Sequence, residues 1–147
     1  VLNIKVIEDL REKMGKIYGG GFHGSLAKEP YERYSIQLQL PCGPESVDKL
    51  VEAANIEINE LVAKGPDAKD LDKVKSQWRE KHITDVKENK YWDGALENVL
   101  FWGRDKDRVL NYQQYVDKLT PADIQATAKK LFSGGNKFTA ILYPESN

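Results

Sequence analysis

The segment that most constrains the fold is a junction between a helical pattern and a run of glycines. Residues Leu10–Phe22 read LREKMGKIYGGGF, and the helical pattern before them repeats an apolar residue every four positions, at Leu2, Val6 and Leu10. This spacing places the apolar side chains on one helix face. Glycine readily takes the left-handed conformation that closes a helix, so we expect the helix to end at Gly15 and a strand to begin at Lys16.

Three consecutive glycines, Gly19, Gly20 and Gly21, are unusual in a strand. Glycine loses the most backbone entropy on folding and has no side chain to pack, so close approach of another backbone is the usual reason for it. One interpretation is an extended peptide added edge to edge, with Arg11 and Tyr18 at the entrance. The alternative is a loop or bulge in which Arg11 is solvated and Tyr18 is half-buried.

A second strand pattern follows a short polar turn at Ala27–Pro30. Apolar side chains alternate with polar ones over Tyr31–Leu40, which predicts a strand with one buried face. A turn this short joins antiparallel neighbours, so the two strands should form a hairpin.

Helical patterns dominate the rest of the chain. Apolar residues spaced by three and four predict a helix over Glu45–Lys64, which Gly65 and Pro66 end. Weaker patterns of the same kind predict helices over 67–89, 91–102 and 109–119.

The segment Thr120–Asp123 predicts the start of another helix, since Thr can cap it, Pro121 suits the first turn and Asp123 can complete a capping box. This helix should run to Phe132. The apolar run Phe138–Tyr143 then predicts a closing strand.

This order of elements predicts an α+β fold, with helices packed on one face of a mainly antiparallel sheet. The 147 residues are 40% hydrophobic, enough for a single domain over 1–147. A net charge of -1 excludes a general attraction to nucleic acid, and no apolar run has the roughly 20 residues that a membrane span needs. The chain begins without Met and already within a helical pattern, so we expect it to be a fragment of a longer chain.

The residues that bind metals or act as nucleophiles are few. The two histidines, His23 and His82, each lack a second His four residues away, so no zinc motif on a helix can be built and we expect no metal site in this chain. Each is more simply explained as a structural or solvated residue. The one cysteine, Cys42, has no predicted His partner and is expected to be a small apolar residue.

The pair Arg11 and Tyr18, seven residues apart, resembles the Arg and Tyr pair in the C-terminal half of the M16 (insulinase or pitrilysin-like) zinc peptidases. The segments PYERYSIQLQLPCGPESVDKL and LTPADIQATAKKLF add to the likeness, particularly to bacterial PqqL-type members. The resemblance covers nearly the whole chain. It implies an M16 peptidase half-domain, LuxS/metallohydrolase-like and truncated at its N-terminus.

The resemblance also implies a function. The chain would be the non-metal-binding C-terminal domain of a zinc metallopeptidase, and its partners would be an HxxEH-containing N-terminal domain of the same parent and an extended peptide substrate. Arg11 and Tyr18 would bind substrate carbonyl oxygens, Tyr18 would also stabilise the oxyanion, and Gly19–Gly21 would line the peptide. Zinc would belong to the parent, so the fragment alone should carry no cofactor and be inactive. The location implied is the bacterial periplasm or cell envelope.

Two other functions stay open. Some M16 relatives lack catalysis and act as scaffold or assembly subunits, and an HxxEH motif upstream in the parent would favour the enzyme. A stand-alone peptide-binding domain unrelated to M16 would bind peptide without a partner. An exposed sheet edge could also pair two copies of the fragment as a homodimer.

Overall fold

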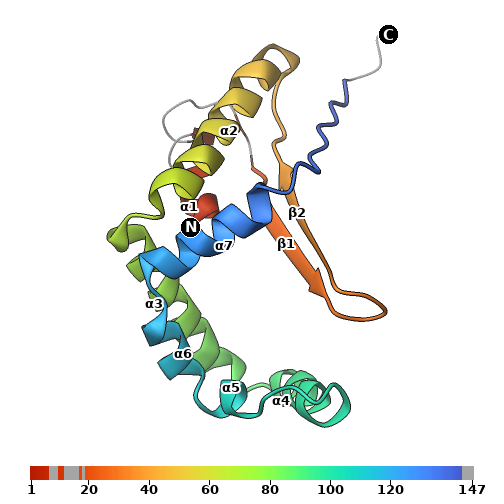
Figure 1. The fold of residues 1–147 in the computed structure, drawn as a ribbon, viewed down its shortest axis with the longest axis vertical. Coiled ribbons are helices and arrows are strands. Elements are labelled where there is room, and N and C mark those ends of the chain that lie inside the picture. Colours follow the sequence, from red (N-terminus) through yellow and green to blue (C-terminus); the bar gives the residue numbers. More distant parts are fainter. Residues whose placement is uncertain (7–9, 12–16, 18, 144–147) are drawn as a thin grey trace. The chain divides into compact units, whose positions relative to one another are not determined.

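The computed structural model describes residues 1–6, 10–11, 17 and 19–143 (Figure 1). The chain forms two compact units. We call the first the hairpin unit, made of Val1–Gly65 and Gln125–Asn147, and the second the helical unit, Pro66–Ile124.

The hairpin unit begins with α1 (Leu2–Lys5), and the backbone is again helical at Leu10 and Arg11. The predicted end of the helix at Gly15 and the predicted strand start at Lys16 lie outside the described residues.

The predicted hairpin is present. Strands β1 (Gly21–Ala27) and β2 (Arg33–Gln39) pair antiparallel, from Gly21 opposite Gln39 to Ala27 opposite Arg33. The prediction that Gly19 and Gly20 belong to the strand was wrong, because β1 begins only at Gly21. Gly20 has a φ of 91°, which does not fit the extended backbone of a strand.

Helix α2 (Val47–Lys64) follows β2 through the short helix η2 (Pro44–Ser46). The predicted stop is confirmed: Gly65 has a φ of 76° and donates its N–H to the carbonyl of Leu61 over 2.9 Å. Glycine accepts this backbone conformation at little cost, so α2 ends cleanly.

One apolar cluster joins the first helical segment, the base of the hairpin and α2. Its buried members are Val6, Leu10, Ile17, Leu50 and Ala54, and the half-buried residues packed on it are Phe22, Leu38, Leu40, Cys42 and Ala53. Cys42 therefore packs as the small apolar residue that the sequence predicts.

The prediction of one buried face along the second strand holds only near this cluster. Ile36 and Leu38 are half-buried, whereas Tyr34 and Leu26, further along the hairpin, are exposed. The outer part of the hairpin extends beyond the cluster, so an alternating pattern alone does not bury its apolar face.

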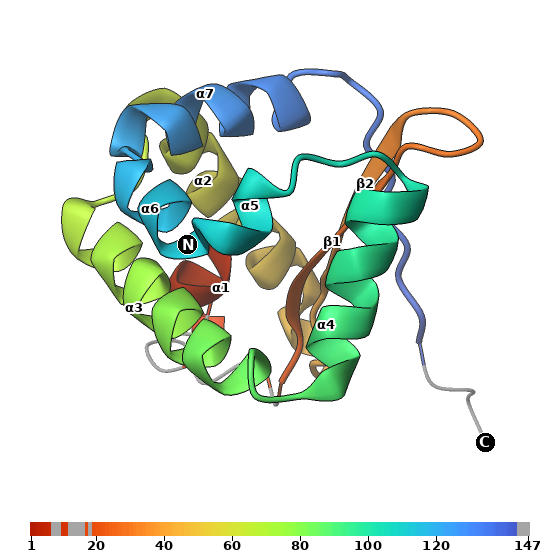
Figure 2. The same ribbon diagram turned by 90° about the horizontal axis from the view of Figure 1, so that it is seen from below.

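The helical unit contains α3 (Ala68–Asp85), α4 (Asn89–Leu96), the π-helix η3 (Glu97–Phe101), α5 (Asp107–Leu110) and α6 (Tyr112–Lys118). Figure 2 labels the four α-helices of this unit. The helix predicted over 67–89 ends at Asp85, four residues early. In place of the single helix predicted over 109–119 there are two short helices, α5 and α6, which meet at Asn111.

Helices α3 and α6 of the helical unit are joined by polar contacts to Asp117. Arg79 donates from Nε and Nη2 to Asp117 Oδ1 over 3.1 and 2.5 Å, and Lys75 donates from Nζ to the Asp117 carbonyl over 3.0 Å. These side chains are largely exposed, so the ion pair contributes only about 0–1 kcal/mol.

Helix α7 (Pro121–Phe132) begins in the helical unit and ends in the hairpin unit. The predicted capping box is present. The N–H and the hydroxyl of Thr120 donate to Asp123 Oδ2 over 2.8 and 2.7 Å, and the N–H of Asp123 donates to Thr120 Oγ1 over 3.3 Å.

The prediction of a closing strand over Phe138–Tyr143 was wrong. These residues pair with no strand, and the sheet of the described residues has two strands. Phe138 and Leu142 are 90% and 97% exposed. An apolar run becomes a strand only where a neighbouring edge pairs with its N–H and C=O groups. The fold is nevertheless α+β, as predicted.

Candidate functional site

Along the chain, the residues that the sequence indicates lie between the first helical segment and the start of β1. Arg11 is exposed and directly follows Leu10, which is completely buried in the apolar cluster. The cluster thus anchors the backbone from which Arg11 extends. Tyr18 lies outside the described residues.

Gly20 is required by the backbone of β2. A Cβ at this position would lie 2.1 Å from the carbonyl oxygen of Gln39 and 2.8 Å from Cδ of Pro41. The close backbone approach expected from the glycines is therefore real. The approaching backbone is that of the chain itself.

Gly21 is required by a side chain, that of Asn3. A Cβ on Gly21 would lie 2.6 Å from Asn3 Oδ1. The same amide binds both backbone groups of the next residue: Asn3 Nδ2 donates to the Phe22 carbonyl over 2.9 Å, and the Phe22 N–H donates to Asn3 Oδ1 over 2.6 Å. Asn3 was not singled out from the sequence. The only signal for it was an amide side chain, able both to donate and to accept, in an otherwise apolar and charged first helix.

This contact limits where a peptide could add to β1. Along an antiparallel strand the backbone groups of alternate residues point to opposite edges. Because Phe22 directs its groups to Asn3, the groups of Gly24 and Leu26 face the same outer edge of β1. Asn3 occupies that edge at Phe22, so an added strand could not pair with the Phe22 backbone there.

The two histidines lie in different units. His23 is exposed on β1, opposite Gln37. His82 is half-buried in the helical unit, where its ring stacks on Tyr112 with centroids 4.3 Å apart and meets the edge of Tyr91 at 5.6 Å. His82 is therefore a packing residue of that unit.

No group of three or more His, Cys, Asp or Glu side chains is arranged to hold a metal ion within the part of the chain that the structure describes. None of the helices described there is both long and apolar enough to cross a membrane.

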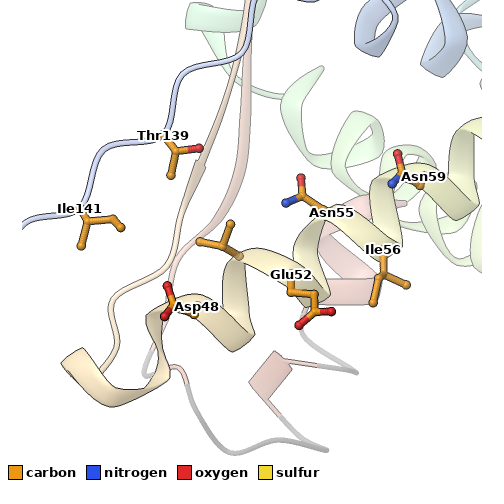
Figure 3. A pocket seen from close by; sticks show the side chains of 8 residues that line it. Asp48, Glu52, Asn55, Ile56, Asn59, Thr139 and Ile141 are labelled. Carbon is orange, nitrogen blue, oxygen red and sulfur yellow. The ribbon is translucent and has the colours of Figure 1, made fainter.

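A groove of about 490 Å³ lies along α2 in the hairpin unit. Figure 3 shows Glu52, Asn55 and Ile56 on the helix, with Thr139 and Ile141 on the C-terminal segment across from them. Neither Arg11 nor the glycines line this groove, so it is a separate feature from the junction.

The family model of the peptidase M16 inactive domain matches residues 4–78 of this chain. The chain belongs to this family. The matched M16 segment includes the positions of Arg11, Tyr18 and the three glycines.

Known proteins extend this likeness beyond the matched segment. A PQQL-like zinc protease of Arabidopsis thaliana is 26% identical over 151 residues, which cover 99% of this M16 chain. The crystal structure of the periplasmic protease PqqL from Escherichia coli matches 90% of it with a TM-score of 0.70 and 20% identity. A protease from Helicobacter pylori matches 87% with a TM-score of 0.65 and 18% identity.

This M16 chain is short beside these proteins. It spans 14% of the Arabidopsis relative, 15% of the E. coli structure and 30% of the H. pylori structure. At these identities the two solved structures establish a shared α+β fold.

Proposed function

We propose that this chain is the non-metal-binding C-terminal domain of a zinc metallopeptidase and that its two units belong to one domain over 1–147. The family match over residues 4–78 carries this proposal. It is supported by a relative described as a zinc protease, whose likeness runs through both units. Zinc and the HxxEH motif would then lie in an N-terminal domain of the parent, which would be the partner of this one.

Within that enzyme, Arg11 and Tyr18 would bind the substrate. An exposed guanidinium donates strong hydrogen bonds to a carbonyl oxygen or to an oxyanion, and a phenol hydroxyl supplies another donor. The buried Leu10 fixes the backbone beside Arg11, and contacts to β2 and Asn3 fix Gly20 and Gly21. A backbone fixed on both sides of the junction would favour donors that stabilise a developing charge without reorganising.

The glycines would leave room for the peptide. An added Cβ at Gly19 would meet nothing within 4 Å, so its backbone borders open space. An extended substrate running past Gly19–Gly21 could pair with the backbone groups of this segment that face away from β2, as in strand addition.

The test is peptide hydrolysis by the full-length parent carrying Tyr18→Phe, which removes one hydroxyl and keeps the ring. If Tyr18 stabilises the oxyanion, kcat falls by about a hundredfold or more at unchanged zinc content. Tyr31→Phe is the matched control, since Tyr31 is an exposed phenol on the hairpin turn. Unchanged turnover in Tyr18→Phe would contradict the role and favour an inactive M16-like scaffold.

We also propose a periplasmic or cell-envelope location for the parent. The support is the E. coli neighbour, which is described as a periplasmic protease. Cell fractionation of the producing bacterium, with detection of this domain by antibody, tests it. Recovery with the cytoplasmic fraction would contradict it.

A further inference from the structure

The helical unit contains a pocket of about 360 Å³ between α4 and η3 on one side and α5 and α6 on the other. Its half-buried lining includes Tyr91, Val99 and Tyr112, and its exposed lining includes Asn98, Arg104 and Arg108. The pocket therefore has an aromatic and apolar floor below a polar rim.

The rim is held in place by the backbone of η3. The N–H of Trp102 donates to the Glu97 carbonyl five residues back, over 3.2 Å, and the N–H of Arg104 donates to the Asn98 carbonyl over 2.9 Å. Single π-helical turns of this kind often occur at functional sites. Here the turn sets the backbone of Arg104 beside that of Asn98.

The floor is held by aromatic packing. The rings of Tyr91 and Tyr112 enclose His82, which contacts both. Burial raises the pKa of the Tyr91 hydroxyl, and Tyr112 and Asp85 raise it further. Like an ordinary phenol, this group is a hydrogen-bond donor at physiological pH.

The rim carries a net positive charge. The lining includes two guanidinium groups, those of Arg104 and Arg108, and one carboxylate, that of Asp105. Asp105 Oδ1 already accepts the N–H of Asp107 over 2.9 Å at the start of α5. Within the described part of the chain neither arginine forms an ion pair, so both guanidiniums can bind an anionic partner.

We propose that this pocket binds a peptide carboxylate that is next to an apolar or aromatic side chain. Guanidiniums pair with carboxylates through two parallel hydrogen bonds, and the floor takes the neighbouring side chain. Asn98 donates Nδ2 to the Gly94 carbonyl over 2.7 Å, which leaves its Oδ1 to accept a peptide N–H. The site lies in the helical unit and does not depend on the role of Arg11.

The first experiment titrates the 147-residue chain with acetyl-Ala-Ala-Phe carrying a free carboxylate and follows backbone amide shifts by NMR. We expect shifts at residues 94–112 and a Kd on the order of 1 mM, as for a small ligand. The C-terminal amide of the same peptide should bind at least about tenfold more weakly. Acetyl-Asp-Phe-amide, tested in parallel, shows whether a side-chain carboxylate serves as well as a terminal one.

Variants locate the contact. Arg104→Gln and Arg108→Gln should each weaken binding of the free-acid peptide about tenfold, because each removes a charge-assisted hydrogen bond. Lys106→Gln is the matched control, since Lys106 is an exposed cation in the same loop that does not line the pocket. Gly94→Leu tests the cavity itself: a Cβ there meets nothing within 4 Å, and the larger side chain should occupy the pocket and weaken binding of the free acid.

Three results would overturn the proposal. The acid and the amide could bind equally, Lys106→Gln could weaken binding as much as the pocket variants, or the free acid could shift no amide of residues 94–112. Each would show that the carboxylate is not held by this rim.

Discussion

The side chain of Asn3 binds both backbone groups of Phe22 and takes the place of a neighbouring strand at the start of β1. Its amide offers a donor and an acceptor at 2.9 and 2.6 Å, as an opposing strand residue would. This contact ties the first helical segment to the hairpin and sets the backbone beside the candidate site.

Replacing Asn3 tests that contact. Asn3→Ala removes both hydrogen bonds and should lower the free energy of unfolding by about 1–2 kcal/mol, with chemical denaturation as the measurement. Asn3→Asp, which is ionised at pH 7, keeps an acceptor for the Phe22 N–H but loses the donor to the Phe22 carbonyl, so it should be less stable than the wild type at that pH. Equal stability of all three proteins would show that the contact contributes nothing.

The glycines of the junction should differ sharply in tolerance. Gly20→Ala places a methyl group against the Gln39 carbonyl at a φ of 91°, and should cost at least about 2 kcal/mol. Gly24→Ala, within β1 and with open space around it, should change stability by no more than about 0.5 kcal/mol. Comparable costs for the two variants would contradict the close approach of β2.

The capping box at α7 predicts that the stability of the folded protein depends on pH. Hydrogen bonds from Thr120 lower the pKa of Asp123 below its ordinary value of 3.8. A lowered folded-state pKa means that the contribution is present above 3.8 and is lost as pH falls through the folded value. Asp123→Asn should therefore be less stable than the wild type at pH 6, and the difference should shrink as the pH falls through the folded-state pKa of Asp123.

Thr120 gives a second test of the same box. Thr120→Ala should cost about 1 kcal/mol, while Thr120→Ser, which keeps the hydroxyl, should stay close to the wild type. Thermal denaturation of the three proteins measures the difference. A serine variant as unstable as the alanine variant would show that the methyl group, and not the cap, matters.

The raised pKa of Tyr91 predicts a loss of stability at alkaline pH. Its pKa is raised above 10.0 by burial, and the nearby Tyr112 and Asp85 add to this, so the folded protein holds the phenol proton more tightly than the unfolded chain. The resulting stability is complete below pH 10 and is lost as pH rises through the folded pKa. The wild type should therefore lose stability above pH 10 more steeply than Tyr91→Phe. Parallel stability curves for the two proteins would contradict it.

Local signals in the sequence were sufficient for much of the fold. The hairpin, α2 with its stop at Gly65, and the cap at Thr120 each depend on residues close together in the chain. The closing strand at Phe138–Tyr143 depended instead on a distant partner edge, which an apolar run does not specify. The break between α5 and α6 had no glycine or proline to mark it.

The candidate site divides in the same way. The helical approach of Leu10 and Arg11 followed from spacing, and the close approach of another backbone followed from the three consecutive glycines. The partners that explain these glycines, Asn3 and Gln39, are 18 and 19 residues away from them in sequence. Contacts at such separations need the folded chain, and so did the rim of Arg104 and Arg108.

Arg11 offers the most direct measurement of the central proposal. In the full-length parent, kcat for peptide hydrolysis should fall about a hundredfold or more in Arg11→Ala, with zinc content and folding unchanged. Lys28→Ala, which removes an exposed cation at the hairpin turn, should leave kcat unchanged. If Arg11→Ala hydrolyses peptide as fast as Lys28→Ala, this domain takes no part in the chemistry through Arg11, and the account of its function is wrong.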